Sequence, residues 1–135
     1  MRNTTSPNQQ SFTISGRIKS VHYAIHGLAT MLRSQHNAWL HALATVLVVT
    51  AGFCFGLGRW EWCGIILAIV SVWIAEALNT ALEFLADMAC PTEHPEVKKA
   101  KDVAAGAVLI SAIGAVLIGI LVMGPHIAKL VELLG

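Results

Sequence analysis

Three carboxylates and one carboxamide recur at helical spacing in an otherwise apolar part of the chain. They are Glu76, Asn79, Glu83 and Asp87, which follow the uncharged segment 62–75. At 100° per residue, the last three lie within about 60° of Glu76, so all four share one face of a helix. Such a row of oxygen atoms could hold a divalent cation, accept a proton from a hydroxyl, or relay protons.

The position of this stripe in an apolar segment favours a functional role. An ionisable group inside a membrane span costs about 2.5–3.5 kcal/mol, whereas a polar contact between spans returns only about 0.6 kcal/mol on average. Counted from Glu61, Glu76 lies about 22 Å along the helix and Glu83 about 33 Å. We therefore expect Glu76 within the cytoplasmic half of the membrane and Glu83 near the headgroups. Asp87 could equally be a solvated residue at the helix end.

A second polar group follows the stripe in the sequence. Lys98, Lys99, Lys101 and Asp102 precede the next apolar run. Lysines of this kind are commonly solvated, but a lysine beside carboxylates can also act as a point charge on phosphate. The chain has neither a Walker A loop nor a protein-kinase signature. Residue types alone thus leave open a phosphotransferase, a proton or ion carrier, and a non-enzymatic assembly protein.

Composition defines the surroundings in which these residues must work. The chain has 135 residues, of which 56% are hydrophobic and 13% are charged, about half the ~25% charge of soluble domains. The net charge of +1 and the absence of nucleic-acid-binding motifs argue against a nucleic-acid partner. Cys54, Cys63 and Cys90 form no close pair, so we interpret them as apolar filler. The composition predicts an all-α integral membrane protein.

Three segments are long enough to cross the ~30 Å hydrocarbon core. We place the spans at about 37–57, 61–88 and 100–123. The second reaches the required length only if it includes Glu76. Glycines at 56–58 predict a tight turn after the first span, and prolines at 91 and 95 predict a loop over 90–99.

The N-terminal part has a different character. We expect a flexible tail over 1–14, a surface helix over 15–34, and a short C-terminal extension over 126–135. In the surface helix, Ile18, Val21, Ile25 and Leu28 fall on one stripe with Arg17 off it, which is typical of a helix lying in a membrane interface. An ordinary packing helix is the alternative.

Lysine and arginine predict the orientation of the spans. Seven of these basic residues precede the first span or lie between the second and third spans, and two lie on the other side of the membrane. By the positive-inside rule, the N-terminus and the second loop are cytoplasmic. The seven are Arg2, Arg17, Lys19, Arg33, Lys98, Lys99 and Lys101, and the two are Arg59 and Lys129.

Several of these blocks together resemble a known family. The octapeptide EALNTALE at 76–83, Asp87, the pair His94-Pro95 and AKDVAAGAVL at 100–109 are similar to the signature of the bacterial integral-membrane diacylglycerol kinase and undecaprenol kinase family. The resemblance runs from about Arg17 to Pro125. It implies a homotrimer of three-span subunits in the bacterial inner membrane, with active sites between subunits at the cytoplasmic face.

The resemblance also implies roles for individual residues. Glu76 would be the catalytic base toward the lipid hydroxyl, with Asn79 beside it in the active site. Glu83 would bind the Mg²⁺ that bridges the phosphates of ATP. The residues expected to contact the nucleotide are Arg17, Tyr23, Glu83, Asp87, His94, Lys101 and Asp102.

One position departs from the family pattern. The family often has a second metal-binding glutamate just before the first span, where this chain has Gln35. Glutamine offers a carbonyl ligand without charge, so we predict a metal site of Glu83 and Gln35, with Asp87 or water as further candidate ligands. The metal is expected to bind more weakly.

The sequence thus predicts an ATP- and Mg²⁺-dependent kinase of a membrane lipid, either diacylglycerol or undecaprenol. Asn37, the pair Glu61-Trp62 and the pair His94-Pro95 look closer to the undecaprenol kinase branch. The alternative is a small proton or ion carrier that uses Glu76, Asn79 and Glu83 as its relay. Neither lipid requires a pocket that a sequence would reveal.

Overall fold

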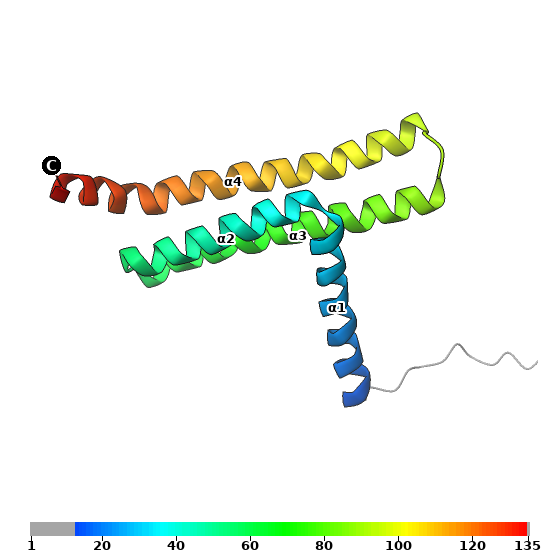
Figure 1. Cartoon of the computed structure of the whole chain (residues 1–135), viewed down its shortest axis with the longest axis horizontal. Coiled ribbons are helices and arrows are strands. Elements are labelled where there is room, and N and C mark those ends of the chain that lie inside the picture. The colour runs from blue at the N-terminus through cyan, green and yellow to red at the C-terminus, as the bar shows by residue number, and fades with distance from the viewer. Residues whose placement is uncertain (1–12, 135) are drawn as a thin grey trace, which may run out of the picture.

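The computed structural model describes residues 13–134, which form four helices: α1 (Ile14–Ser34), α2 (His36–Phe55), α3 (Arg59–Ala89) and α4 (Pro95–Leu134). Helices α2, α3 and α4 run side by side, and α1 leaves this bundle crosswise (Figure 1). The last three are each long and apolar enough to cross a membrane. The expected all-α membrane architecture is confirmed. Residues 1–12 of the tail predicted over 1–14 lie outside the described part of the chain.

Local chemistry sets the helix boundaries. Thr13 Oγ1 accepts a hydrogen bond from the Gly16 amide at 3.2 Å and caps α1. Gly56 ends α2 with a φ of 65°, a left-handed conformation that glycine adopts without steric cost. At the start of α3, Glu61 Oε2 accepts a hydrogen bond from the Gly58 amide at 2.7 Å. The turn at 56–58 therefore lies where the glycines predict it.

The loop before α4 is shorter than expected. The prediction placed it over 90–99, but α4 already begins at Pro95, because proline is well suited to the first helical position. Lys98 and Lys99 are therefore helical. At its other end α4 continues through Pro125 to Leu134, so the segment expected as an extension belongs to the same helix.

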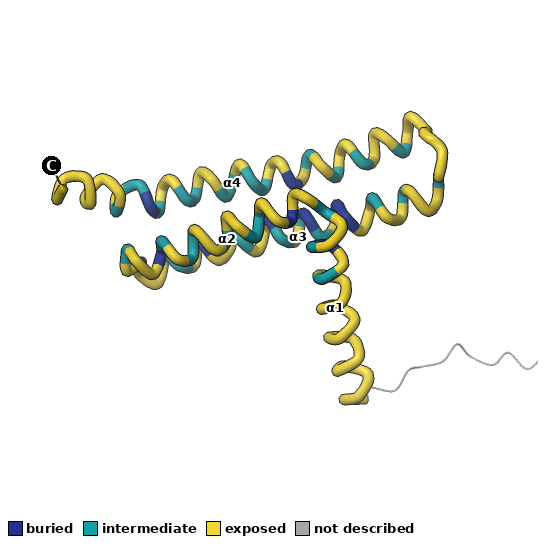
Figure 2. The backbone as a smooth tube through the Cα atoms, viewed as in Figure 1, coloured by how far each residue is buried: buried dark blue, intermediate teal, exposed yellow. Residues whose placement is uncertain are grey.

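The interior of the bundle is a narrow strip, and outward faces are exposed (Figure 2). Its apolar core surrounds Leu57, Ile65 and Met123 near the α2–α3 turn. At the same end, His126 Nε2 lies 2.8 Å from Glu61 Oε1, and Phe55 stacks on the His126 ring. These contacts join α4 to the turn, while the exposed apolar faces are suited to contact with lipid.

Helix α1 contacts the bundle near its C-terminal end. Met31 is its buried residue, whereas Ile18, Val21 and Ile25 are each about three-fifths exposed or more. No other part of residues 13–134 covers this apolar stripe. That arrangement fits an interfacial helix better than an ordinary packing helix.

Candidate functional site

The predicted polar stripe lies on one face of α3, and its burial decreases toward the end of the helix. Glu76 is 1% exposed and Asn79 is 6% exposed. Glu83 is half-buried and Asp87 is exposed. The helix therefore carries its acidic groups from the interior of the bundle to its surface at the α3–α4 loop.

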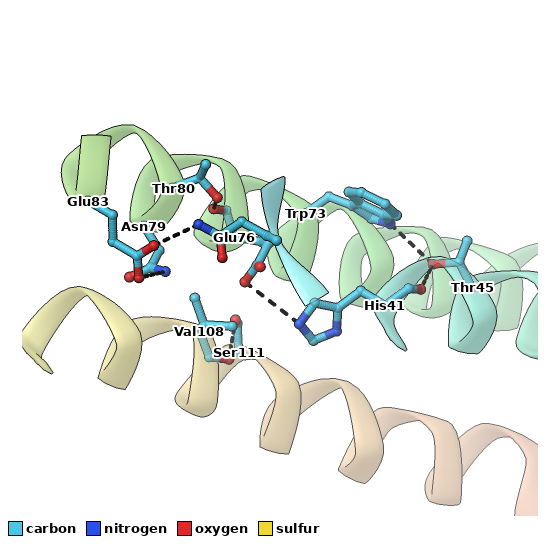
Figure 3. Close-up of polar contacts among 10 residues, drawn as sticks. His41, Thr45, Trp73, Glu76, Asn79, Thr80, Glu83, Val108 and Ser111 are labelled. Carbon is cyan, nitrogen blue, oxygen red and sulfur yellow. Dashed lines mark hydrogen bonds and ion pairs between the residues drawn. The ribbon is translucent and has the colours of Figure 1, made fainter. Parts of the chain in front are cut away.

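Two carboxamides hold the Glu83 carboxylate. Asn79 Nδ2 donates to Glu83 Oε1 at 3.0 Å from one turn earlier on α3 (Figure 3). Gln35 Nε2 donates to Glu83 Oε2 at 2.7 Å. Gln35 connects α1 to α2 in an extended conformation. The structure thus brings together the two residues that the sequence predicts as metal ligands, with Asn79 beside them.

Two oxygen atoms in this stripe have unused hydrogen-bonding capacity. Among the described residues, Glu76 Oε2 and Asn79 Oδ1 are buried side-chain oxygens without a hydrogen-bond partner. Buried polar atoms are normally paired, so each such atom calls for an explanation. Both atoms are acceptors, and they can bind a donor or cation that enters the site.

Glu76 has a basic neighbour that sequence reasoning did not assign. His41, on α2, places Nε2 at 3.9 Å from Glu76 Oε2, close enough for electrostatic attraction but too long for a hydrogen bond. The sequence signal was a single histidine in an otherwise uncharged span. A lone histidine does not reveal its partner, because the partner lies on another helix.

Four of the other predicted nucleotide-binding residues lie together at the α3–α4 loop. Lys101 Nζ donates to Asp87 Oδ1 at 2.8 Å. These two residues, with His94 and Asp102, line a cavity of about 560 Å³. Arg17 and Tyr23 lie on α1, which extends away from the bundle. A single chain therefore does not bring these two residues to the loop cavity.

Comparison with known proteins identifies the family. The family model described as prokaryotic diacylglycerol kinase matches residues 22–123. The chain belongs to this family. Undecaprenol kinase of Bacillus subtilis is 38% identical over 109 residues, covering 81% of this chain and 89% of the relative. Diacylglycerol kinase of Synechocystis is 37% identical over 112 residues, covering 82% of this chain but 64% of the relative.

The resemblance stated from the sequence motifs is therefore confirmed. The chain is a lipid kinase and a multi-pass membrane protein. A lipid kinase must accommodate both a phosphoryl donor and a lipid acceptor. The individual roles of the stripe residues stay predictions, which the geometry supports to different degrees.

The oxygen atoms around Glu83 are chemically suited to a magnesium ion. Among residues 13–134, no group of three or more His, Cys, Asp or Glu side chains is close enough to hold a metal. Mg²⁺ in phosphoryl-transfer sites commonly takes one or two protein carboxylates and completes its shell with phosphates and water. Glu83, with the unpartnered Asn79 Oδ1 one turn away, matches that sparse ligand set. Gln35 would need to turn its carbonyl oxygen toward the ion.

An apolar cavity lies next to the buried end of the stripe. It has a volume of about 220 Å³ and is lined by residues of α2, α3 and α4. His41 and Thr45 are the polar side chains in its lining, and the others are apolar or small. His41, whose Nε2 lies 3.9 Å from Glu76 Oε2, thus connects this apolar cavity to the buried carboxylate.

Proposed function

We propose that this enzyme transfers the γ-phosphoryl group of ATP to the primary hydroxyl of a membrane lipid at the cytoplasmic face of the bacterial inner membrane. The observation that carries the proposal is the Glu76 carboxylate. It is buried, it has an oxygen without a hydrogen-bond partner, and its neighbour His41 lines an apolar cavity. A lipid hydroxyl is the kind of group that can reach such a place and donate a hydrogen bond there.

Glu76 would act as the general base. Its free oxygen accepts the proton of the lipid hydroxyl as the hydroxyl oxygen forms a bond to the γ-phosphorus, and the bond from that phosphorus to the β–γ bridging oxygen breaks. ADP leaves with the bridging oxygen, and the proton passes from Glu76 to water. The Asn79 amide orients the neighbouring Glu83 carboxylate.

Glu83, Asn79 and Gln35 would hold Mg²⁺, which when bound supplies positive charge to the phosphate oxygens. Lys101 would add a point charge on the phosphates from the α4 side. Its ion pair with Asp87 keeps the ammonium group beside the loop cavity. His94 and Asp102 line the same cavity and would contact the rest of the nucleotide.

The complete site would lie between subunits of a homotrimer. Arg17 and Tyr23 are predicted nucleotide contacts, but α1 carries them away from the loop cavity of the same chain. A neighbouring copy could supply these contacts, and closed symmetry is the usual arrangement of homo-oligomers. The N-terminus and the α3–α4 loop would face the cytoplasm, in line with the distribution of lysine and arginine.

Undecaprenol is the proposed preferred acceptor. The relative named undecaprenol kinase is matched over 89% of its length and the relative named diacylglycerol kinase over 64%. Both acceptors present one primary hydroxyl on a long apolar body. A proton carrier is less well supported, since the polar row ends at His41 and Thr45 in an apolar cavity.

The test is phosphate transfer by the purified protein in mixed micelles. Labelled ATP is offered with undecaprenol or diacylglycerol, with and without Mg²⁺. The expected result is label in undecaprenol that requires Mg²⁺. Glu76→Gln should lower turnover by about 10²–10⁴-fold, the usual contribution of a general base. Glu132→Gln, an exposed carboxylate near the end of α4, is the matched control and should retain turnover. Near-normal turnover in Glu76→Gln would exclude the proposed base.

A further inference from the structure

We propose that His41 is a positioning residue for Glu76. In this proposal, the Trp73–Thr45 hydrogen bond fixes the position of α2 along α3, so that His41 faces the Glu76 carboxylate. The inference rests on the proposed role of Glu76 as the base. It adds a residue on a different helix from the acidic stripe, together with the contact that holds it in place.

The first support is the electrostatic isolation of Glu76. The side chain of His41 is 18% exposed and that of Glu76 is 1% exposed, so water screens the pair weakly. Within residues 13–134, His41 is the one basic group within ion-pair distance of Glu76. An imidazole at 3.9 Å from Oε2 can therefore orient the carboxylate without occupying its hydrogen-bonding position.

The neighbouring hydroxyl groups do not compete for this role. Thr80 Oγ1 donates to the backbone carbonyl of Glu76 at 2.8 Å. On the facing side of α4, Ser111 Oγ donates to the Val108 carbonyl of its own helix at 2.9 Å (Figure 3). Both hydroxyl groups therefore donate to backbone carbonyls of their own helices. Beyond these, the polar side chains of the stripe nearest along α3 are Asn79 and Glu83, which bond to each other.

The second support is a hydrogen-bonded link between the helices. Trp73 Nε1 donates to Thr45 Oγ1 at 3.1 Å, and Thr45 Oγ1 donates to the His41 carbonyl at 2.7 Å. Trp73 lies about one turn before Glu76 on α3, and Thr45 lies about one turn after His41 on α2. The Trp73–Thr45 hydrogen bond and the His41–Glu76 ion pair are thus successive contacts between α2 and α3 (Figure 3). A shift of one helix along the other would break both contacts together.

The consequence for catalysis is specific. A residue that only orients the base contributes to the chemical step and leaves the affinity for ATP and lipid nearly unchanged. His41→Leu should lower kcat by about tenfold, a coupling typical of residues in one network, with both KM values within about twofold. His41→Gln keeps an N–H group of similar reach and should restore part of kcat.

Thr45 allows a matched comparison on α2. Thr45→Val removes the hydroxyl that joins the two helices and should lower kcat less than His41→Leu. Thr50→Val removes a similar hydroxyl, which donates to the Val46 carbonyl at 2.7 Å and is exposed. This control should leave kcat unchanged. An equal loss in both threonine variants, or a loss in neither, would overturn the link.

A double-mutant cycle separates positioning from general destabilisation. In a Glu76→Gln background, His41→Leu should cause no further loss of the residual rate, because its effect passes through Glu76. A further loss of similar size would overturn the proposal. The proposal would also be overturned if His41→Leu raised the KM values for ATP and lipid and retained kcat.

The same variants distinguish the two proposals. Full kcat in His41→Leu, with Glu76→Gln inactive, overturns the positioning role and leaves the proposed function intact. If the unmodified protein transfers no phosphate, the proposed function fails. The coupling is then measured from the thermal unfolding of the unmodified protein, the two single variants and the double variant. A coupling of zero in that measurement overturns the His41–Glu76 pair as well, whereas a favourable coupling supports it.

Discussion

Gln35 and Glu83 are 48 residues apart in the chain, yet Gln35 Nε2 donates to Glu83 Oε2 at 2.7 Å. Gln35 is the one residue between α1 and α2, and its amide therefore fastens the junction of these helices to α3. A carboxylate at this position would face Glu83 with like charge unless a cation lay between them. The neutral amide allows the contact to form without metal.

Replacing this amide by a carboxylate should lower the stability of the metal-free protein and strengthen the binding of Mg²⁺. In Gln35→Glu, the two carboxylates repel each other without metal, so the metal-free protein should unfold at a lower Tm. With Mg²⁺ the pair supplies two carboxylate ligands, and the Mg²⁺ concentration for half-maximal kinase activity should fall by about tenfold. The measurements are unfolding curves and magnesium titrations of phosphate transfer.

Gln35→Met is the control for this prediction, because it keeps the approximate length of the side chain without polar atoms. It should lower Tm at all Mg²⁺ concentrations and should not lower the half-maximal concentration. If Gln35→Glu behaves like Gln35→Met in the magnesium titration, the position does not contribute to the metal site.

Much of the fold follows from hydropathy and helix-boundary residues. Gly56 and Gly58 place the α2–α3 turn, and the number of long apolar runs matches the number of spanning helices. The loop predicted over 90–99 is too long by several residues, because Pro95 begins α4 instead of lying inside the loop. The continuation of α4 past Pro125 was not predicted, since local composition there resembles an ordinary helix end.

The site was predictable where it lies on one helix. The 3.6-residue period places Glu76, Asn79 and Glu83 on one face, and the structure has all three at least partly enclosed. Contacts between helices were harder to predict. The position of His41 against Glu76 depends on the relative height of α2 and α3, which a side chain such as Trp73 determines and no local periodicity encodes.

Lys101 should affect nucleotide binding far more than stability. Its ammonium group pairs with the exposed Asp87, and exposed pairs of this kind contribute little to folding. Lys101→Met should raise KM for ATP by about tenfold, with KM for lipid and Tm nearly unchanged. Steady-state kinetics with each substrate varied in turn provide the measurement. Lys129→Met, on the far end of α4, is the control, and a rise confined to the KM for lipid would contradict the assignment.

Gly52 should tolerate no side chain. A Cβ at this position would lie 2.9 Å from Trp62 Cη2 and 3.1 Å from Leu57 Cδ1, closer than packed carbon atoms approach. Gly52→Ala should therefore cost about 1–3 kcal/mol, as overpacking usually does. Gly27→Ala is the control, because a Cβ there has no atom within 4 Å and alanine favours the helix. Unfolding in one detergent compares both variants, and equal stability would mean that α2 and α3 pack less closely here.

The natural cysteines allow the proposed orientation to be tested. Cys90 lies directly after α3, at the loop predicted to be cytoplasmic, and its Sγ lies 3.2 Å from the Thr92 carbonyl. In a Cys54→Ala/Cys63→Ala protein, a membrane-impermeant maleimide should label Cys90 in inverted vesicles and not in intact spheroplasts. Arg59→Cys, introduced after all three natural cysteines are removed, should show the reverse pattern, because it lies at the other end of α3. Labelling of Cys90 from outside would reverse the orientation and place the loop cavity, with Lys101, away from cytoplasmic ATP.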